Sequence, residues 1–300
     1  MPDISKADVI IIGAGPAGIT ASMYTSRAGL KTIILYKDFG ALEKAVHVDN
    51  FYGHVNIGGK QLVKNGIKQA KEFGTTVVNA EVLDIRQNDD MEWTVKTVAA
   101  THTARAVLIA TGANRQAPRI KGLAALQGRG VSYCAVCDGF FHRGKDVAVI
   151  GNGAYALHEA MDLLPIVKSV TILTNGKEKP QPEFPENVII RTEKIQEICG
   201  QSGIMGMTLS GVILENGETL PLSGLFIALG VAGGTELAKK LGAVIENNAI
   251  SVDSNMRTNV PALWAAGDCT GGLKQIAKAV YQGAEAGTDI VKSIKERYFT

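Results

Sequence analysis

Two cysteines and an aspartate form the part of this sequence that is best suited to chemistry. The cysteines stand at the spacing Cys134-Ala135-Val136-Cys137, and Asp138 follows directly. Cysteines at this spacing can close a small disulfide ring, and a thiolate from the reduced pair can attack another disulfide. An adjacent carboxylate can carry protons during that exchange. We therefore predict that Cys134, Cys137 and Asp138 are catalytic and redox-active.

Half of a metal site and a pair of inert buried thiols are the two alternatives for this pair. The other cysteines, Cys199 and Cys269, stand alone, and the sequence holds neither a second C-x-x-C nor clustered histidines. A structural zinc site needs about four ligands of these types, so redox chemistry is favoured and no metal is expected. Cys199 and Cys269 are interpreted as small buried apolar residues. His142 and His158 are interpreted as surface histidines or satisfied core histidines.

A glycine motif near the N-terminus predicts a nucleotide site. An apolar run over 9–12 leads into Gly13-Ala14-Gly15-Pro16-Ala17-Gly18 and then into a helical pattern. Gly13 permits the tight turn, Gly15 lets the backbone approach a pyrophosphate, and Gly18 lets helix and strand pack closely. The N–H groups at the start of the helix favour the anion. The fingerprint also expects an acid at the end of the next strand to bind the ribose, but none stands there, and Asp38 is the nearest candidate for that role. A structural turn without a ligand is therefore the alternative.

A second glycine motif, Gly151-Asn152-Gly153-Ala154-Tyr155-Ala156, follows the apolar run 147–150, but alanine replaces its third glycine. The next strand, 169–173, leads into Thr174-Asn175-Gly176 without an arginine before Arg191. Arginines select the 2′-phosphate of NADPH, whereas NADH sites place an acid at the strand end, and Glu178 comes late for that role. NAD(P)H binding is therefore doubtful, and an inherited fold that has lost this ligand is the alternative.

The two motifs imply two βαβ units, with Gly13 and Gly151 standing 138 residues apart. Continuous apolar strands before glycine turns are typical of parallel sheets covered on both faces. The expected fold class is α/β, with two doubly wound, Rossmann-like domains and the second inserted into the first. We expect an FAD-binding domain at 1–116 and 246–300 and an NAD(P)H-like domain with the C-x-x-C at 117–245. Further strands are expected at 31–36, 75–85, 92–98, 106–110, 188–197, 207–214, 225–229 and 263–266. A long helix at 274–296 is expected to close the chain.

The overall composition is that of an ordinary globular protein. The 300 residues are 46% hydrophobic and 20% charged, with a formal net charge of +2, which gives no case for nucleic acid or an anionic membrane as partner. No apolar run approaches the ~18 residues of a membrane span. The first residues lack the features of a signal peptide, so a cytoplasmic protein is expected.

The sequence resembles the low-molecular-weight thioredoxin reductases over nearly its whole length. The segments that carry this resemblance are Gly13–Gly18, Val48-Asp49-Asn50-Phe51-Tyr52-Gly53, Ala110-Thr111-Gly112-Ala113, 128–141 around the two cysteines, Gly267-Asp268-Cys269-Thr270 and Lys274-Gln275-Ile276-Ala277. The resemblance implies FAD as cofactor, a homodimer, and a thioredoxin-like protein as the disulfide substrate.

The resemblance also implies roles for particular residues. Asp268 would bond the flavin ribitol, Gln275 and Ile276 would lie along the isoalloxazine, and Asn50 would lie near it. Cys137 would face the flavin and Cys134 the substrate. The complete set of expected cofactor-binding residues is Gly13, Ala14, Gly15, Pro16, Ala17, Gly18, Asn50, Val82, Ala110, Thr111, Gly112, Gly267, Asp268, Lys274, Gln275 and Ile276.

Two departures from the family pattern bear on the electron donor. Thr174-Asn175-Gly176 stands where NADPH-dependent members carry a basic His-Arg-Arg-type run, and Phe39-Gly40-Ala41-Leu42 replaces the usual Gly-Gly-Gln-Leu near the flavin. This pattern looks like the divergent branch that includes the ferredoxin-dependent flavin thioredoxin reductases. A donor other than NADPH, such as ferredoxin, is therefore expected, and Tyr298-Phe299 is a candidate shield for the flavin, with a frayed tail as the alternative.

Three other functions stay open at this point. The first is an ordinary NADPH-dependent thioredoxin reductase, and the second is a flavin and thiol redox sensor without fast turnover. The third is an NADH oxidase or peroxide-system flavoenzyme, although the sequence lacks the extra disulfide domain of the peroxide-system type.

Overall fold

The computed structural model describes residues 6–113, 118–178, 183–203, 206–230 and 233–296. Contacts divide the chain into two compact units, Met1–Arg115 with Gly233–Thr300, and Gln116–Ala232. The inserted unit thus ends at Ala232, whereas an end at 245 was predicted from the sequence. The difference arises because helix α6 (Gly234–Lys240) belongs to the first unit, where a side chain at Gly234 would collide with Thr111 and Ile109.

A five-stranded parallel sheet forms the centre of the first unit. Its strands, in spatial order, are β18 (Leu263–Ala265), β7 (Ala106–Ile109), β1 (Val9–Ile12), β2 (Thr32–Tyr36) and β3 (Thr76–Asn79). Strands β1, β7 and β18 are buried along their whole length, which explains their continuous apolar sequences. The carboxyl ends of β1 and β7 lie side by side, because Ile12 pairs with Ile109.

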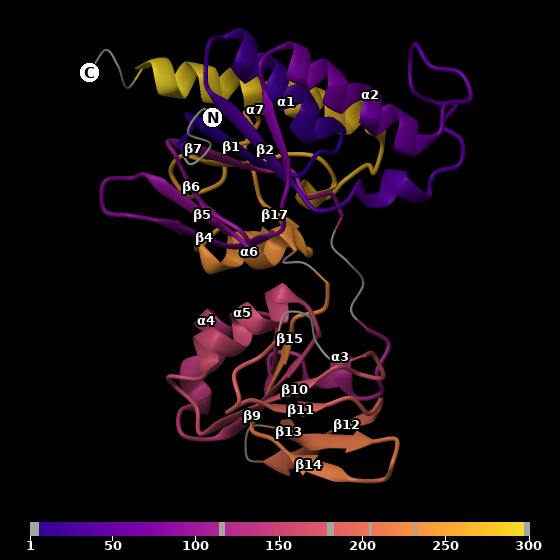
Figure 1. Cartoon of the computed structure of the whole chain (residues 1–300), viewed down its shortest axis with the longest axis vertical. Helices are drawn as coiled ribbons and strands as arrows, with labels where there is room; N and C mark the ends of the chain where they lie inside the picture. Colours follow the sequence, from indigo (N-terminus) through magenta and orange to yellow (C-terminus); the bar gives the residue numbers. More distant parts are fainter. Residues whose placement is uncertain (1–5, 114–117, 179–182, 204–205, 231–232, 297–300) are drawn as a thin grey trace. The chain divides into compact units, whose positions relative to one another are not determined.

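Three helices accompany this sheet, and Figure 1 shows them together: α1 (Pro16–Arg27), α2 (Gly59–Glu72) and α7 (Ile276–Glu296). Helix α1 packs closely on α7, since a Cβ at Gly283 would lie 2.3 Å from the Ala17 carbonyl oxygen and one at Gly287 would lie 2.8 Å from that of Ala21. The predicted closing helix is confirmed, although it begins at Ile276 rather than at 274.

The strand predicted over 75–85 is wrong, because two strands of different sheets occupy that range. Strand β3 ends at Asn79 in the parallel sheet, and β4 (Val82–Gln87) begins an antiparallel sheet with β5 (Trp93–Thr97) and β6 (Thr101–Ala104). The chain leaves one sheet for the other at Ala80 and Glu81, and the Glu81 carboxylate accepts a hydrogen bond from Lys37 at 2.9 Å. The remaining short elements of this unit are η1 (Gly40–Lys44), β16 (Ile245–Glu246), β17 (Ala249–Ile250) and η3 (Asp268–Thr270).

The inserted unit repeats the parallel architecture. Its sheet has the order β11 (Ile189–Arg191), β10 (Ser169–Leu173), β9 (Asp146–Ile150), β15 (Gly224–Ile227) and β8 (Val131–Ser132), all parallel. An antiparallel sheet adds β12 (Ile195–Gly203), β13 (Gly206–Leu214) and β14 (Thr219–Pro221). The helices are α3 (Leu123–Leu126), α4 (Ala135–Asp138), η2 (Gly139–His142) and α5 (Ala154–Leu163). The strand predicted over 188–197 is also wrong, because β11 and β12 belong to different sheets.

A buried carboxylate on α7 connects this helix to the sheet of the first unit. The Asp289 carboxylate accepts hydrogen bonds from Arg257, with Nη2 at 2.9 Å, and from the buried Trp264 indole at 2.9 Å. The hydrogen bond to Asp289 raises the pKa of Arg257. We expect Asp289→Ala to lower the free energy of unfolding by about 2–3 kcal/mol, because it leaves a buried indole N–H and a cation without their acceptor. Urea denaturation would measure this loss.

Glu296 gives the matched control for Asp289. It lies on the same helix and faces Lys292 at 3.9 Å, but its side chain is 63% exposed. Exposed pairs of this kind contribute little, so Glu296→Ala is expected to leave the urea midpoint unchanged. Equal losses in the two variants would show that the buried network is not what fastens α7.

None of the helices in the described part of the chain combines the length and apolar character of a membrane-spanning segment. Across the same residues, no group of three or more histidine, cysteine, aspartate or glutamate side chains is placed to bind a metal ion.

Candidate functional site

Cys134 and Cys137 are joined in a disulfide at the start of the short helix α4. Strand β8 ends at Ser132, and Cys134 then takes an extended backbone conformation as the residue that caps α4. The Cys134 sulfur accepts the N–H of Cys137 at 3.1 Å. Cys134 is 2% exposed and Cys137 is partly exposed, so Cys137 is the more accessible cysteine in this structure.

Asp138 is connected to the disulfide segment through Ser132. The Ser132 hydroxyl donates to the Asp138 carboxylate at 2.6 Å and accepts the N–H of Cys134 at 3.1 Å. The structure therefore brings the three predicted catalytic residues together. Ser132 was not among the predicted site residues, and its position at the end of a strand, two residues before Cys134, is the signal that could have assigned it a role.

The first glycine motif forms a tight loop between β1 and α1. Gly13 has a φ of +116°, and a Cβ there would lie 2.2 Å from the Ala110 carbonyl oxygen. A Cβ on Gly18 would lie 2.0 Å from the Gly13 carbonyl oxygen, so both positions require glycine. Gly15 differs, because a Cβ there would meet no atom within 4 Å. The turn is therefore closed around Gly13 and Gly18 and open at Gly15, where a pyrophosphate would approach.

Several other residues expected to bind the cofactor gather beside this loop. Thr111 lies next to Gly13, and its hydroxyl is buried without a hydrogen-bond partner among the described residues. Gly267 lies next to α1, since a Cβ on Gly267 would lie 3.1 Å from the Cβ of Ala17. Asp268 follows it at the start of η3 and is partly exposed. The loop, Thr111 and Gly267 thus form one cluster in the first unit.

Asn50 and Gln275 form a second group of expected residues in the same unit. The Asn50 side-chain amide donates to the Gln275 side-chain oxygen at 2.9 Å, although the two residues are 225 positions apart. Both are exposed, as is Lys274, whereas Ile276 begins α7 and is partly buried. Val82 is buried at the start of β4, where it pairs with Thr97.

Lys278 is a residue of this region that the sequence analysis missed. Its ammonium group donates to the Gly267 carbonyl at 2.9 Å, to the Thr270 hydroxyl at 3.2 Å and to the Gly271 carbonyl. Burial lowers the pKa of Lys278. Lys278 therefore holds the Gly267–Gly271 loop in place from α7, one turn after the Gln275 segment.

The second glycine motif also forms a close turn, between β9 and α5. A Cβ on Gly151 would lie 2.3 Å from the Ala228 carbonyl oxygen and 2.7 Å from the Cβ of Ala156. Gly153 caps α5 in an extended conformation. The inserted unit thus keeps the strand–turn–helix geometry of a nucleotide-binding loop, with Ala156 packed in place of the third glycine.

The end of β10 is occupied by contacts within the inserted unit. The Thr174 hydroxyl donates to the Lys177 carbonyl at 2.7 Å, and the Asn175 side chain accepts the N–H of Ile195 at 2.8 Å. Arg191 lies beside Leu173 on the neighbouring strand. Its guanidinium bonds both Glu193 and Glu218, each at 2.8 Å, and these bonds lower the pKa of both carboxyls.

Comparison with known proteins identifies the class of this chain. Residues 7–283 match the family described as pyridine nucleotide-disulphide oxidoreductase. The chain belongs to that family. A thioredoxin reductase of Listeria monocytogenes is 34% identical, over 96% of this chain and 94% of the relative.

Two solved structures share the fold over nearly the whole chain. The atypical thioredoxin reductase TRi from Desulfovibrio vulgaris Hildenborough superposes with a TM-score of 0.89, at 38% identity, over 96% of this chain and 98% of that chain. A ferredoxin-flavin thioredoxin reductase from Clostridium acetobutylicum superposes with a TM-score of 0.69, at 26% identity, over 97% and 99%. This chain is therefore a flavin-dependent disulfide oxidoreductase of the thioredoxin reductase type, which confirms the predicted fold class, enzyme class and FAD.

The first unit of this oxidoreductase fits FAD. The open position at Gly15 leaves room for a pyrophosphate beside the start of α1, where no side chain of the described residues caps the helix. An open backbone position at a helix N-terminus is expected of a site for a phosphate group.

Asp268→Ala is expected to weaken FAD binding by about 1.5–3 kcal/mol, because a ribitol hydroxyl would lose a charged acceptor. That loss corresponds to roughly a tenfold to hundredfold rise in the dissociation constant of FAD. Fluorescence titration of the apoprotein with FAD would measure it. Asp90→Ala is a suitable control, since Asp90 is exposed in a loop of the same unit. Retention of FAD at the parent affinity by the Asp268 variant would remove Asp268 from the site.

The remaining two cysteines of the oxidoreductase differ from the disulfide pair. Cys269 is buried, and its S–H donates to the Ala266 carbonyl at 3.2 Å. Burial raises the pKa of this thiol to about 12, so it stays protonated and unreactive near neutral pH. Cys199 was predicted to be buried but is partly exposed on β12, and burial raises the pKa of its thiol as well.

The two histidines, interpreted from the sequence as surface or satisfied core residues, lie partly buried in η2 (His142) and buried in α5 (His158). The His142 ring lies edge-on to Phe226, with centroids 5.6 Å apart, and Nδ1 lies 3.2 Å from the Ser223 hydroxyl. Burial lowers the pKa of His142. His158 is 7% exposed within α5, and Nε2 lies 3.7 Å from an Asp162 oxygen.

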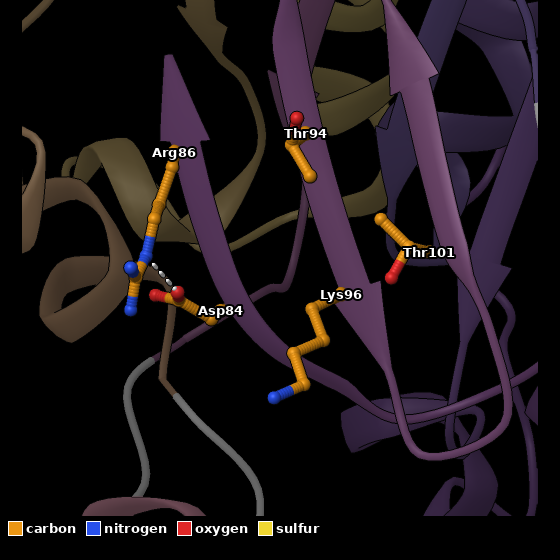
Figure 2. A pocket seen from close by; sticks show the side chains of 5 residues that line it. All are labelled: Asp84, Arg86, Thr94, Lys96 and Thr101. Carbon is orange, nitrogen blue, oxygen red and sulfur yellow. Dashed lines mark hydrogen bonds and ion pairs between the residues drawn. The ribbon is translucent and has the colours of Figure 1, made fainter. Parts of the chain in front are cut away.

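A pocket of about 240 Å³ lies on the antiparallel sheet of the first unit, the sheet that also contains Val82. Figure 2 shows its lining side chains, with the Arg86 guanidinium on the Asp84 carboxylate at 2.6 Å and Lys96 and Thr101 on the adjoining strands. None of its lining residues is a cysteine or belongs to a glycine motif.

Proposed function

We propose that this oxidoreductase passes electrons from FAD through the Cys134–Cys137 disulfide to the disulfide of a thioredoxin-like protein, and that its electron donor is not NADPH. The observation that carries the proposal is the closed Cys134–Cys137 disulfide, beside which the Ser132 hydroxyl hydrogen-bonds both the Asp138 carboxylate and the N–H of Cys134. FAD, when bound, supplies a carrier that can accept electrons singly or in pairs and deliver a pair to the disulfide.

The chemistry of the chain's own residues balances in two stages. The Cys134–Cys137 disulfide takes up two electrons and two protons and opens to two thiols. One of these, as a thiolate, then attacks the partner's disulfide and forms a mixed disulfide, and the second cysteine displaces the partner as a dithiol while the Cys134–Cys137 bond closes again. Asp138 can accept and return protons in both stages, because Ser132 holds its carboxylate at this segment.

The surface around α4 supports a protein as the electron acceptor. Val136, Phe140 and Phe141 are 55%, 68% and 72% exposed, and they lie within four residues of Cys137. Exposed aromatic side chains near a reactive group are typical of protein–protein contacts. The name of the Listeria relative, a thioredoxin reductase, supports a thioredoxin-like acceptor. The family resemblance assigns Cys134 to the substrate side and Cys137 to the flavin side, which is opposite to their accessibility in this structure, where Cys134 is buried and Cys137 is partly exposed.

Charge at the end of β10 supports a donor other than NADPH. Arginines usually bind the 2′-phosphate of this nucleotide, but Arg191 already pairs with Glu193 and Glu218. An incoming phosphate would have to displace two carboxylates. The name of the Clostridium structure supports a ferredoxin as the alternative source of electrons. A homodimer and a cytoplasmic location belong to the same proposal, whereas the suggested flavin shield, Tyr298-Phe299, lies outside the described residues.

Thioredoxin turnover with a nicotinamide-free reductant tests this proposal. Reduced ferredoxin, or reduced methyl viologen as a one-electron substitute, would be mixed anaerobically with the FAD-loaded enzyme and oxidised thioredoxin. We expect multiple turnovers, at rates on the order of 1 s⁻¹ or faster. Reduction of the flavin without any thioredoxin dithiol would instead support the sensor function that the missing nicotinamide signature suggests.

A further inference from the structure

Glu159 is a buried acid that has no part in the chemistry described so far. It lies on α5, and only 1% of its surface is exposed. Its carboxylate accepts the backbone N–H of Ala135 at 2.7 Å. Ala135 is the residue between Cys134 and Val136, so a buried carboxylate lies directly against the disulfide segment.

The hydrogen bond between Glu159 and Ala135 lies where it can affect both the backbone of the cysteine segment and the charge of the cysteine sulfurs. Ala135 is the first residue of α4, and neighbouring backbone contacts of the segment include the Cys134 N–H on Ser132 and the Cys137 N–H on the Cys134 sulfur. Glu159 therefore supplies one of several hydrogen bonds that hold the cysteine segment, and its acceptor is a buried acid. A carboxylate near a sulfur disfavours the thiolate, because two negative charges repel each other in a poorly solvated site.

We propose that Glu159 is a positioning residue of the disulfide centre, which holds the segment through the Ala135 N–H and uses its charge to keep the reduced pair in the thiol form. Disulfide centres whose reduced form is stabilised as a thiolate are strong oxidants. A carboxylate at this point has the opposite effect and makes the dithiol a stronger reductant. This role rests on the proposed function of Cys134 and Cys137, which must deliver electrons to a protein disulfide.

Other charged groups near the segment define the necessary controls. His158 and Asp162 lie on the same helix as Glu159, and Asp138 lies on α4 with its carboxylate on Ser132. Asp162 is the matched control, because it is a largely buried acid of α5 with 20% of its side chain exposed, and its partner at 3.7 Å is His158 rather than the disulfide segment.

Thiol reactivity tests the role of Glu159 without flavin reduction or thioredoxin. The protein would be reduced with dithiothreitol, freed of reductant anaerobically and alkylated with iodoacetamide at pH 7. Mass spectrometry would follow the peptide that carries Cys134 and Cys137, with the Cys199 peptide as an internal reference. We expect Glu159→Gln to raise the rate at the pair about tenfold, the effect of one pKa unit on a mostly protonated thiol. The Cys199 rate should stay at its parent value.

Two further variants separate charge from structure. Asp162→Asn is expected to leave alkylation of the pair unchanged. Ala135→Pro removes the N–H but retains the Glu159 carboxyl group, and proline is tolerated at the first residue of a helix. Its alkylation rate should equal or fall below that of the parent. An unchanged rate in Glu159→Gln, or an equal rise in either of the other variants, would overturn the proposal.

Failure of this test and failure of the proposed function can be told apart. Alkylation reports on the two thiols alone, whereas thioredoxin turnover needs the flavin, the disulfide and the partner. Parent-like reactivity in Glu159→Gln together with rapid turnover of the parent would remove the role of Glu159 and leave the proposed function intact.

Discussion

Replacing either Cys134 or Cys137 by serine is expected to lower thioredoxin turnover by at least about a thousandfold. Residues that act as one chemical unit lose nearly all activity when a single member is removed. Without Cys134 or Cys137 no intramolecular disulfide can form, so the enzyme can neither store the electron pair nor resolve a mixed disulfide. The measurement is the steady-state rate of thioredoxin dithiol formation with reduced methyl viologen as donor.

Cys199→Ser is the matched control for these variants. Cys199 is a partly exposed thiol of the same inserted unit, on β12, and has no part in the proposed site. Its replacement should leave the rate unchanged. Parent-like turnover by the Cys134 or the Cys137 variant would place the redox site elsewhere in the chain.

NADPH at ~100 µM, which lies within the usual range of KM values, is expected to leave the flavin absorbance band unbleached over many seconds under anaerobic conditions. The reason is the charge around Arg191, whose two partners, Glu193 and Glu218, leave it no surplus positive charge for a 2′-phosphate. The opposite result, full bleaching by micromolar NADPH within seconds, would restore an ordinary NADPH-dependent thioredoxin reductase.

The double substitution Glu193→Gln and Glu218→Gln tests the cause of this discrimination. It removes two carboxylates and frees the Arg191 guanidinium, which lies beside the end of β10. We expect NADPH to bind about tenfold more tightly, or better, because arginine–phosphate pairs are strong, charge-assisted contacts. NADH lacks the 2′-phosphate, so its binding should be unaffected. Equal gains for the two nucleotides would show that Arg191 does not face the phosphate.

The central strands of the parallel sheets could be predicted from the sequence because they are continuously apolar and several run directly into glycine turns. Strands β1, β9 and β10 lie where the pattern placed them. The errors fell at places where the chain passes from one sheet to another without a change in composition. Between Asn79 and Val82 no glycine or proline marks the transition, so the hydrophobic pattern alone could not divide β3 from β4.

The candidate site was predictable in its cysteines and glycines but not in its supporting contacts. The C-x-x-C and the glycine turn each consist of residues that are close together in the sequence, so both could be predicted from it. The pairing of Asn50 with Gln275 depends on the complete fold of the first unit, and only family resemblance suggested that both lie near one ligand. The contacts of Glu159 with Ala135 and of Arg191 with Glu218 likewise join residues 24 and 27 positions apart that share no motif.

A two-electron reduction followed by thiol counting tests the central claim most directly. The FAD-loaded enzyme would be reduced anaerobically with one equivalent of dithionite and mixed with excess oxidised thioredoxin, and the thioredoxin thiols would be trapped and counted by mass spectrometry. The proposed route predicts one thioredoxin dithiol for each electron pair and re-formation of the Cys134–Cys137 disulfide. A flavin that is reduced and then stays reduced, with thioredoxin still oxidised, would contradict it.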